Sequence, residues 1–212
     1  MSATAVLPPP SPRRPTPRIS SVLNLAMLHR LTVEDFHRMI DAGVFRKDER
    51  VELIDGYLVQ KMSHKPPHDG SLFALQDYII KVLGIGWVCR VQSAITLSES
   101  EPEPDLAIVR GDARTYFTRH PNALDFGIAI EVSDSSLGID RTDKLAMYSR
   151  NGVPEYWIVN IPERQIEVYA SPQSSDLEPH YAVRTDYGVG QSVPIALDGR
   201  PIAAIPVAEV LP

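Results

Sequence analysis

One short segment, residues 127–133, most constrains what this chain can fold into. It reads Gly-Ile-Ala-Ile-Glu-Val-Ser, so both faces of a strand formed here would be apolar or small except at Glu131. Strands with that pattern are covered by other elements on both sides, as in the sheet of an α/β protein. The segment therefore predicts an internal strand that carries one carboxylate.

The remaining patterns supply helices and further strands for such a sheet. A capping box at Thr32 predicts a helix that ends near Gly43, and an Asp-Gly pair at residues 55–56 predicts the turn of a hairpin. A second helix is expected after Pro66, and a third over residues 140–150. This order of elements predicts an α/β or α+β domain with a mixed sheet. The expected strands span residues 51–54, 57–59, 87–97, 105–109, 156–159 and 165–169.

The start of the chain is rich in proline and predicts a tail before a single domain. Six of the 19 prolines fall before residue 18, where large apolar side chains are scarce. Such a stretch cannot bury enough surface to offset its ordering entropy. We therefore expect a disordered tail over residues 1–20 and a single domain over residues 21–212, a length that can bury a sizeable core.

Composition also bears on the compartment. No apolar run approaches the roughly 18 residues that a helix needs to span a bilayer, so no membrane partner is expected. The single cysteine, Cys89, cannot form an internal disulfide, which favours a reducing compartment. The early arginines precede only a short, interrupted apolar stretch, which is a weak export signal. We expect a cytoplasmic protein.

The net charge of −6 argues against a protein that coats nucleic acid by charge alone. Residues 1–50 nevertheless carry 8 basic and 5 acidic side chains, a net of +3, so the basic excess belongs to the start of the chain. Any binding to nucleic acid must therefore rest on a metal ion, a local basic patch or this N-terminal region. Such binding should weaken as salt is added.

Two carboxylates stand within or beside apolar runs. Glu131 lies in the expected internal strand, where an unpaired charge is costly, so it should have a partner, a bound metal or a raised pKa. The alternative is a strand-end glutamate that reaches solvent or pairs with an arginine. Asp105 opens the apolar run at residues 106–109, and its alternative role is to cap a turn. Position alone does not decide between these roles.

A lysine, a tyrosine and a third carboxylate accompany them. Lys144 sits one turn into the third expected helix, and the short loop from the strand before it can bring its ammonium beside Glu131. Tyr148 shares the same helix face. Glu52 lies in the hairpin strand before the Asp-Gly turn, and His68 lies just ahead of the apolar positions of the second helix. Their ordinary alternatives are a solvated lysine, a surface glutamate and a histidine that merely flanks a helix start.

Together these residues resemble the PD-(D/E)XK nuclease superfamily and, more closely, the Uma-two family of restriction endonucleases. The resemblance implies a restriction-endonuclease-like core, in which a mixed β-sheet is flanked by helices and the site lies at one edge of the sheet. It runs from about residue 30 to residue 170. The matching segments are residues 49–56, 103–109, 130–137, 140–144, 148 and 152–159.

The resemblance implies a role for each matching residue. Asp105, which follows a proline, stands at the aspartate of the motif, and Glu131 stands at its second acidic position. Ser133 occupies the place where the superfamily has its lysine, so the resemblance implies that Lys144 on the following helix takes over that part. Glu52 matches an acidic residue before the Asp-Gly turn and would be an outer or second-metal ligand.

Phosphodiester hydrolysis fits these residue types, because charge on the scissile phosphate must be neutralised and a hydroxide delivered in line. Two carboxylates and a backbone carbonyl suit Mg²⁺, with Mn²⁺ as an alternative. In this hypothesis Asp105 and Glu131 hold the ion with help from the carbonyl of Val132. Lys144 orients or deprotonates the attacking water, and Glu52 binds a second ion or a metal-bound water. A single cysteine and scattered histidines do not predict a zinc site.

The leading hypothesis is a Mg²⁺-dependent endonuclease that hydrolyses DNA. The alternatives are a catalytically inactive nuclease fold that serves as a binding or interaction module, and a nuclease that acts on RNA. Cutting both strands of a duplex would favour a homodimer, and the hairpin expected over residues 156–169 could supply its edge. Tyr156 and Trp157 in that hairpin are expected to pack in the core or at this face rather than stack on bases.

Overall fold

The segment around Glu131 forms β5 (Phe126–Ser133), whose eight residues are all buried in this computed structural model. The structure describes residues 27–175 and 177–212, so the tail expected over residues 1–20 lies outside the described residues. β5 lies inside a six-stranded sheet with the strand order β3-β4-β5-β6-β7-β8. The other strands are β3 (Trp87–Val91), β4 (Leu106–Arg110), β6 (Glu155–Asn160), β7 (Gln165–Gln173) and β8 (His180–Gly188).

The sheet is mixed, as the sequence pattern predicts. β5 and β6 run parallel, and the other neighbouring strands run antiparallel. A helical segment connects the two parallel strands, because a parallel pair cannot be joined by a tight hairpin. The expected class, an α/β core with a mixed β-sheet flanked by helices, is confirmed.

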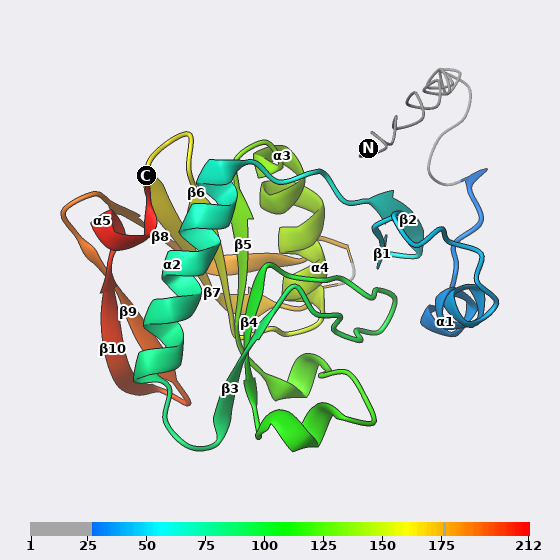
Figure 1. Ribbon diagram of the computed structural model, residues 1–212, viewed down its shortest axis with the longest axis horizontal. Helices are drawn as coiled ribbons and strands as arrows, with labels where there is room; N and C mark the ends of the chain where they lie inside the picture. The colour runs from blue at the N-terminus through cyan, green and yellow to red at the C-terminus, as the bar shows by residue number, and fades with distance from the viewer. Residues whose placement is uncertain (1–26, 176) are drawn as a thin grey trace, which may run out of the picture.

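Helices cover both faces of this sheet (Figure 1). α2 (Pro66–Val82) lies across one face, where Leu72, Leu75 and Ile79 pack against apolar side chains of β4 and β5. α4 (Leu145–Arg150) lies on the other face, and its buried side chains pack against the alternate residues of the same strands. Both faces of β5 are therefore apolar, and Glu131 belongs to the face covered by α4.

The predicted hairpin forms ahead of the sheet. β1 (Val51–Ile54) pairs antiparallel with β2 (Tyr57–Gln60), and the Asp-Gly turn between them takes left-handed backbone angles, with φ of 47° and 81°. Leu53 and Glu101 exchange backbone hydrogen bonds of 3.3 and 2.8 Å. These bonds hold β1 beside the loop that leads into β4.

The strand expected over residues 87–97 is too long. β3 ends at Val91, because Gln92 adopts a left-handed backbone conformation (φ 43°) that turns the chain out of the sheet. The residues from there to β4 form a loop, so the apolar side chains at its far end do not belong to a strand.

The predicted start of the third helix is also wrong. Helical structure begins one turn earlier, in α3 (Leu137–Ile139), and continues through a π-helical turn (Asp140–Lys144) into α4. Asp140 does not cap this helix, since its carboxylate accepts hydrogen bonds from the hydroxyls of Ser133 and Ser136. The consequence is that Asp140 points into the fold beside Lys144 rather than toward solvent.

The described residues outside these elements add a helix at each end, two 3₁₀ helices (Ala113–Tyr116 and Ala123–Asp125) and a hairpin over residues 192–206. α1 begins at the predicted capping box of Thr32. The hairpin over residues 192–206 was not predicted, and its apolar side chains join the core on the α2 face. These elements are α1 (Val33–Asp41), β9 (Ser192–Leu197), β10 (Arg200–Pro206) and α5 (Val207–Val210).

The hairpin of β6 and β7 is not at an edge of the sheet. β8 pairs along β7, so the expectation that this hairpin supplies the edge of a dimer is wrong. Tyr156 and Trp157 are fully buried, which confirms that they are core residues. Among the described residues, no helix combines the length and the hydrophobicity that crossing a membrane requires.

Candidate active site

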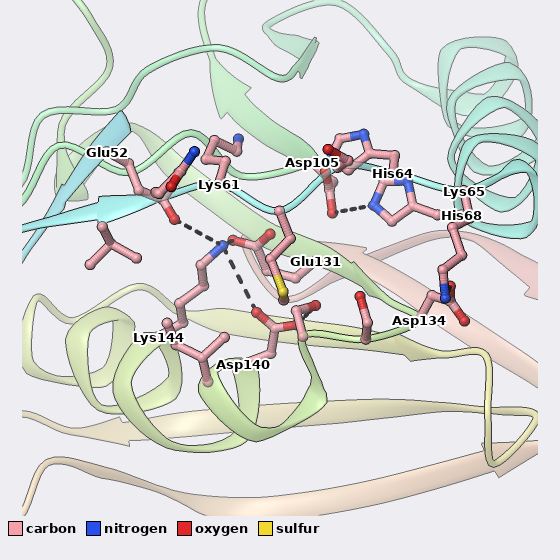
Figure 2. A pocket seen from close by; sticks show the side chains of 17 residues that line it. Glu52, Lys61, His64, Lys65, His68, Asp105, Glu131, Asp134, Asp140 and Lys144 are labelled. Carbon is pink, nitrogen blue, oxygen red and sulfur yellow. Dashed lines mark hydrogen bonds and ion pairs between the residues drawn. The ribbon is translucent and has the colours of Figure 1, made fainter. Parts of the chain in front are cut away.

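The four predicted site residues converge at one end of β4 and β5 (Figure 2). The two strands run antiparallel, so Asp105, just before β4, lies beside the end of β5 that carries Glu131. β1 brings Glu52 to the same place, and the π-helical turn brings Lys144. Each of the four residues is at most 6% exposed. The cluster therefore lies at the ends of two internal strands rather than along a lateral edge of the sheet.

Lys144 is the centre of this cluster. Its Nζ atom lies 2.9 Å from Glu131 Oε1, 3.6 Å from Glu52 Oε1 and 3.8 Å from Asp140 Oδ1. The hydroxyl of Tyr148 donates a hydrogen bond of 3.0 Å to the same Glu131 oxygen. Burial alone would lower the pKa of Lys144, but the three carboxylates outweigh it and raise that pKa. Lys144 is therefore an ammonium ion at neutral pH.

The surroundings of Glu131 disfavour the charged form of its carboxyl group. Burial raises the pKa of its carboxyl group, and the negative charges of Asp105 and Asp140 raise it further, while Lys144 opposes them. One lysine thus does not supply enough positive charge for the carboxylates around it. A further cation against Glu131 would favour its ionised form.

Asp105 is held in its charged form. Its Oδ2 atom accepts a hydrogen bond of 2.9 Å from the backbone N–H of Val132 and lies 3.1 Å from Nε2 of His68. Burial would raise the pKa of Asp105, but the contacts with His68 and Val132 outweigh it and keep the pKa low. The Oδ1 atom takes part in neither contact. It remains free to face an ion.

Glu52 and Val132 complete the predicted set. Glu52 is buried, so the alternative of a surface-facing glutamate is wrong; its Oε2 atom accepts the backbone N–H of Glu103 at 3.1 Å. Val132 touches the site through its N–H to Asp105, while its side chain packs into the core on the α2 face. The role of the Val132 carbonyl as a metal ligand stays a prediction.

These carboxylates line a cavity of about 80 Å³ between the β1–β2 hairpin, the start of α2 and the turn into α3. That volume has room for a cation with bound water. Lys61 and Lys65 also line the cavity. Lys61 donates a hydrogen bond of 2.7 Å to the carbonyl of Glu103, and Lys65 lies 3.3 Å from a carboxylate oxygen of Asp134.

Sequence reasoning missed Asp140 as a site residue and undervalued His68. Asp140 precedes Lys144 by four residues, a helical spacing that could have placed the two side chains together. His68 is buried against Asp105, which lies 37 residues further along the chain, and no local pattern reports a contact of that range.

Comparison with known proteins identifies a family. The model of a family named Uma2, described as "Putative restriction endonuclease", matches residues 33–194. The chain belongs to the Uma2 family. The matched residues include every member of the cluster around Lys144, and the resemblance to the Uma-two family is confirmed.

Solved structures show the same fold. A crystal structure from Anabaena variabilis ATCC 29413, described as "a putative nuclease belonging to DUF820", aligns with a TM-score of 0.63 and 14% identity. The alignment covers 85% of this chain and 97% of that one, and at this identity it shows the fold alone. No curated protein matches the chain. Uma2 membership and the nuclease-like fold together indicate a nuclease.

Proposed function

We propose that this Uma2 protein is a Mg²⁺-dependent endonuclease that hydrolyses DNA phosphodiester bonds, with water as the nucleophile. The observation that carries the proposal is the excess of buried negative charge around Lys144. Ordinary structural ion pairs balance their charges, whereas this cluster does not.

Counting the charges shows what the cavity needs. Four buried carboxylates face two groups that can be cationic, which leaves two negative charges when all six are ionised. Buried charge is costly unless it is paired, and one divalent cation supplies the missing two positive charges. The six groups are Glu52, Asp105, Glu131, Asp140, Lys144 and His68.

The free oxygens of two carboxylates suit such an ion. Lys144 and Tyr148 both contact Oε1 of Glu131, and the contacts of Asp105 are at Oδ2, so each acid keeps a second oxygen for a cation. Mg²⁺ is a hard ion that prefers oxygen ligands, and Mn²⁺ accepts the same set. When bound, the ion would neutralise charge on the scissile phosphate and lower the pKa of a coordinated water. Glu52 Oε1 is placed to hold a second ion or a metal-bound water.

The charge state of Lys144 argues against one of its expected roles, the deprotonation of the attacking water. The surrounding carboxylates raise its pKa, so the Nζ atom keeps its proton at neutral pH. It then orients the attacking water or stabilises the negative charge that develops on the phosphate, rather than taking a proton from the water.

DNA as the substrate is supported by the description of the family as restriction endonucleases. Lys65 lines the cavity with a side chain that is 65% exposed, so it can meet a phosphate backbone there, whereas Lys61 is 7% exposed and pairs with Glu103. Because the net charge is −6, we expect binding to DNA to be weak or selective and to weaken with salt. A homodimer that cuts both strands is part of the proposal, and light scattering with and without duplex DNA measures it.

A cleavage assay tests the proposal. The wild-type chain is incubated with supercoiled plasmid, linear duplex or RNA, in Mg²⁺, Mn²⁺ or EDTA, beside Asp105→Ala, Glu131→Ala and Lys144→Ala. Asp143→Ala is the matched control, because Asp143 is an exposed acid on the same helical turn. We expect the wild type and the control to nick the plasmid only with a divalent ion, and the three site variants to lose that activity.

Other outcomes would contradict it in distinguishable ways. Absence of cleavage by the wild type under every condition would favour an inactive binding module. Equal cleavage by all variants would reject the site, and cleavage of RNA alone would reject DNA as the substrate.

A further inference from the structure

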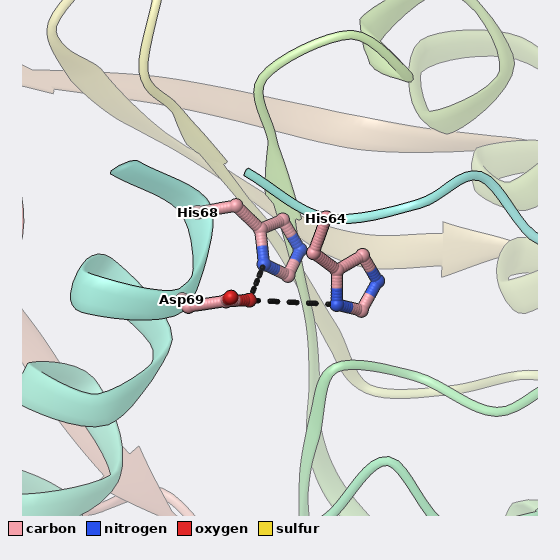
Figure 3. A group of neighbouring side chains, drawn as sticks. All are labelled: His64, His68 and Asp69. Atoms are coloured by element: carbon pink, nitrogen blue, oxygen red, sulfur yellow. Dashed lines mark hydrogen bonds and ion pairs between the residues drawn. The ribbon is translucent and has the colours of Figure 1, made fainter. Parts of the chain in front are cut away.

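A second cluster of ligand-type side chains lies at the rim of the same cavity. His64, His68 and Asp69 face one another at the start of α2 (Figure 3). His64 precedes the helix, whereas His68 and Asp69 belong to its first turn. The histidines that look scattered in the sequence are thus brought together by the fold. None of the carboxylates around Lys144 is a member of this cluster.

One carboxylate oxygen of Asp69 lies close to a ring nitrogen of each histidine. Asp69 Oδ1 lies 3.3 Å from Nδ1 of His68 and 3.6 Å from Nδ1 of His64. Zinc binds nitrogen and carboxylate oxygen at about 2.0–2.1 Å, which places neighbouring corners of a tetrahedron about 3.4 Å apart. The His68 contact is also a hydrogen bond, somewhat longer than the usual N–H···O separation of about 2.9 Å. The two rings stack with their centroids 3.9 Å apart, so they must separate for both nitrogens to bind one tetrahedral ion.

The partners of the two histidines leave these nitrogens suited to an ion. Asp105 Oδ2 lies 3.1 Å from Nε2 of His68, so that nitrogen carries a proton, and when the ring is neutral Nδ1 offers its lone pair to an ion. Histidines that bind metals typically donate their other N–H to a carboxylate in this way. The side-chain amide nitrogen of Gln92 lies 3.2 Å from Nδ1 of His64. An amide N–H donated there makes Nδ1 an acceptor with a lone pair, and a bound ion would take the place of that N–H.

We propose that His64, His68 and Asp69 bind one divalent ion of the zinc type, with a water molecule as the fourth ligand. Two imidazoles and one carboxylate favour Zn²⁺ or Co²⁺ over Mg²⁺, which prefers an all-oxygen set. The bound ion fixes the ring of His68 and thereby positions Asp105, to which that ring donates. This site does not depend on the proposed nuclease function. When it is filled, His68 is neutral, and the excess of negative charge around Lys144 is larger than with a cationic His68.

The competing arrangement has no metal. In it His68 is an imidazolium that donates one N–H to Asp69 and the other to Asp105, and His64 only packs against its ring. The two arrangements differ in what His64 does, because a stacked ring without a ligand role can be replaced with no effect on an ion.

Titration of Zn²⁺ into the EDTA-treated full chain, followed by calorimetry, separates them. We expect one zinc ion per chain in the wild type, and affinity weakened by more than about 10-fold in His64→Gln and in Asp69→Asn. Glu131→Gln and His180→Gln are the controls, one in the carboxylate cluster and one an exposed histidine elsewhere, and both should bind zinc as the wild type does. Co²⁺ should give the visible absorption of a tetrahedral ion in the wild type and lose it in His64→Gln.

Three results would overturn the proposal. They are no zinc binding by the wild type, unchanged binding by His64→Gln and Asp69→Asn, and an equal loss in Glu131→Gln, which would place the ion among the carboxylates. Asp69 is 63% exposed at its side chain and His64 is partly exposed, so neither substitution should prevent folding. Circular dichroism of the metal-free variants checks this. Failure of the plasmid assay has no bearing on the zinc result.

Discussion

Replacing Lys144 with methionine should destabilise the fold, because it removes the central positive charge of the cavity. Methionine keeps most of the length of the side chain, so the change removes mainly the charge. The ammonium is 2.9 Å from Glu131 and also faces Glu52 and Asp140, and all four residues are buried. Removing one partner of a buried ion pair costs about 3–5 kcal/mol, since it leaves buried charge uncompensated.

The cost should fall at the lower end of that range, about 3 kcal/mol, because the pKa values of Glu131 and Asp140 are raised by burial and either group can take up a proton. Lys81→Met is the matched control. Lys81 forms a pair of 2.6 Å with Asp77, but that pair is on the surface of α2, where the lysine side chain is 68% exposed. An exposed helical pair of this kind contributes about 0.3–0.5 kcal/mol.

Urea denaturation followed by circular dichroism, in EDTA and in Mg²⁺, measures both effects. We expect a loss of about 3 kcal/mol for Lys144→Met in EDTA. In saturating Mg²⁺ the loss should shrink, because the ion replaces part of the missing positive charge. A Lys144→Met variant as stable as Lys81→Met would refute the argument from buried charge, and an equal loss with and without Mg²⁺ would refute the link to the cation.

Two further predictions concern parts of the fold outside the cavity. Burial raises the pKa of Glu155 to about 7, so the folded state binds a proton more strongly than the unfolded chain does. This group's contribution to stability is therefore lost as pH rises from about 4.5 to about 7. Glu155→Gln should flatten that decline in urea denaturation between pH 5 and pH 8, and an unchanged decline would contradict the assignment. Gly127→Ala should lower the free energy of unfolding by about 1–3 kcal/mol, because a Cβ there would meet Leu197 Cδ2 at 2.6 Å and Trp87 Cζ3 at 2.7 Å. Thermal denaturation measures this effect, with Gly138→Ala as the control, because a Cβ at Gly138 meets no atom within 4 Å. Equal melting temperatures for the two variants would count against the packing argument.

The parts of the fold that follow from local chemistry could be predicted from the sequence. β5 is recognisable because its apolar run needs cover on both faces, and the first hairpin because its turn requires left-handed angles that an Asp-Gly pair accepts. β8 shows the limit of this reasoning. Most of its residues are exposed, so it has no apolar alternation that could mark it as a strand.

The candidate site also contains residues that the sequence predicts and residues whose placement depends on the tertiary fold. Asp105 and Glu131 stand beside apolar runs and match a family motif, so their approach could be expected from the antiparallel pairing of two neighbouring strands. The burial of Glu52 depends on the backbone bonds between β1 and the loop at Glu101, and no local pattern encodes that contact. His68 reaches Asp105 only because α2 crosses the sheet, which is a property of the tertiary fold.

Thermal unfolding as a function of Mg²⁺ concentration tests the central claim most directly, namely that the carboxylates around Lys144 hold a divalent cation. The wild type, Glu131→Gln and Asp143→Asn are compared in the same titration. The account predicts that Mg²⁺ raises the melting temperature of the wild type and of Asp143→Asn but leaves that of Glu131→Gln unchanged. A wild-type melting temperature that does not respond to Mg²⁺, or one that rises equally in all three proteins, would contradict it.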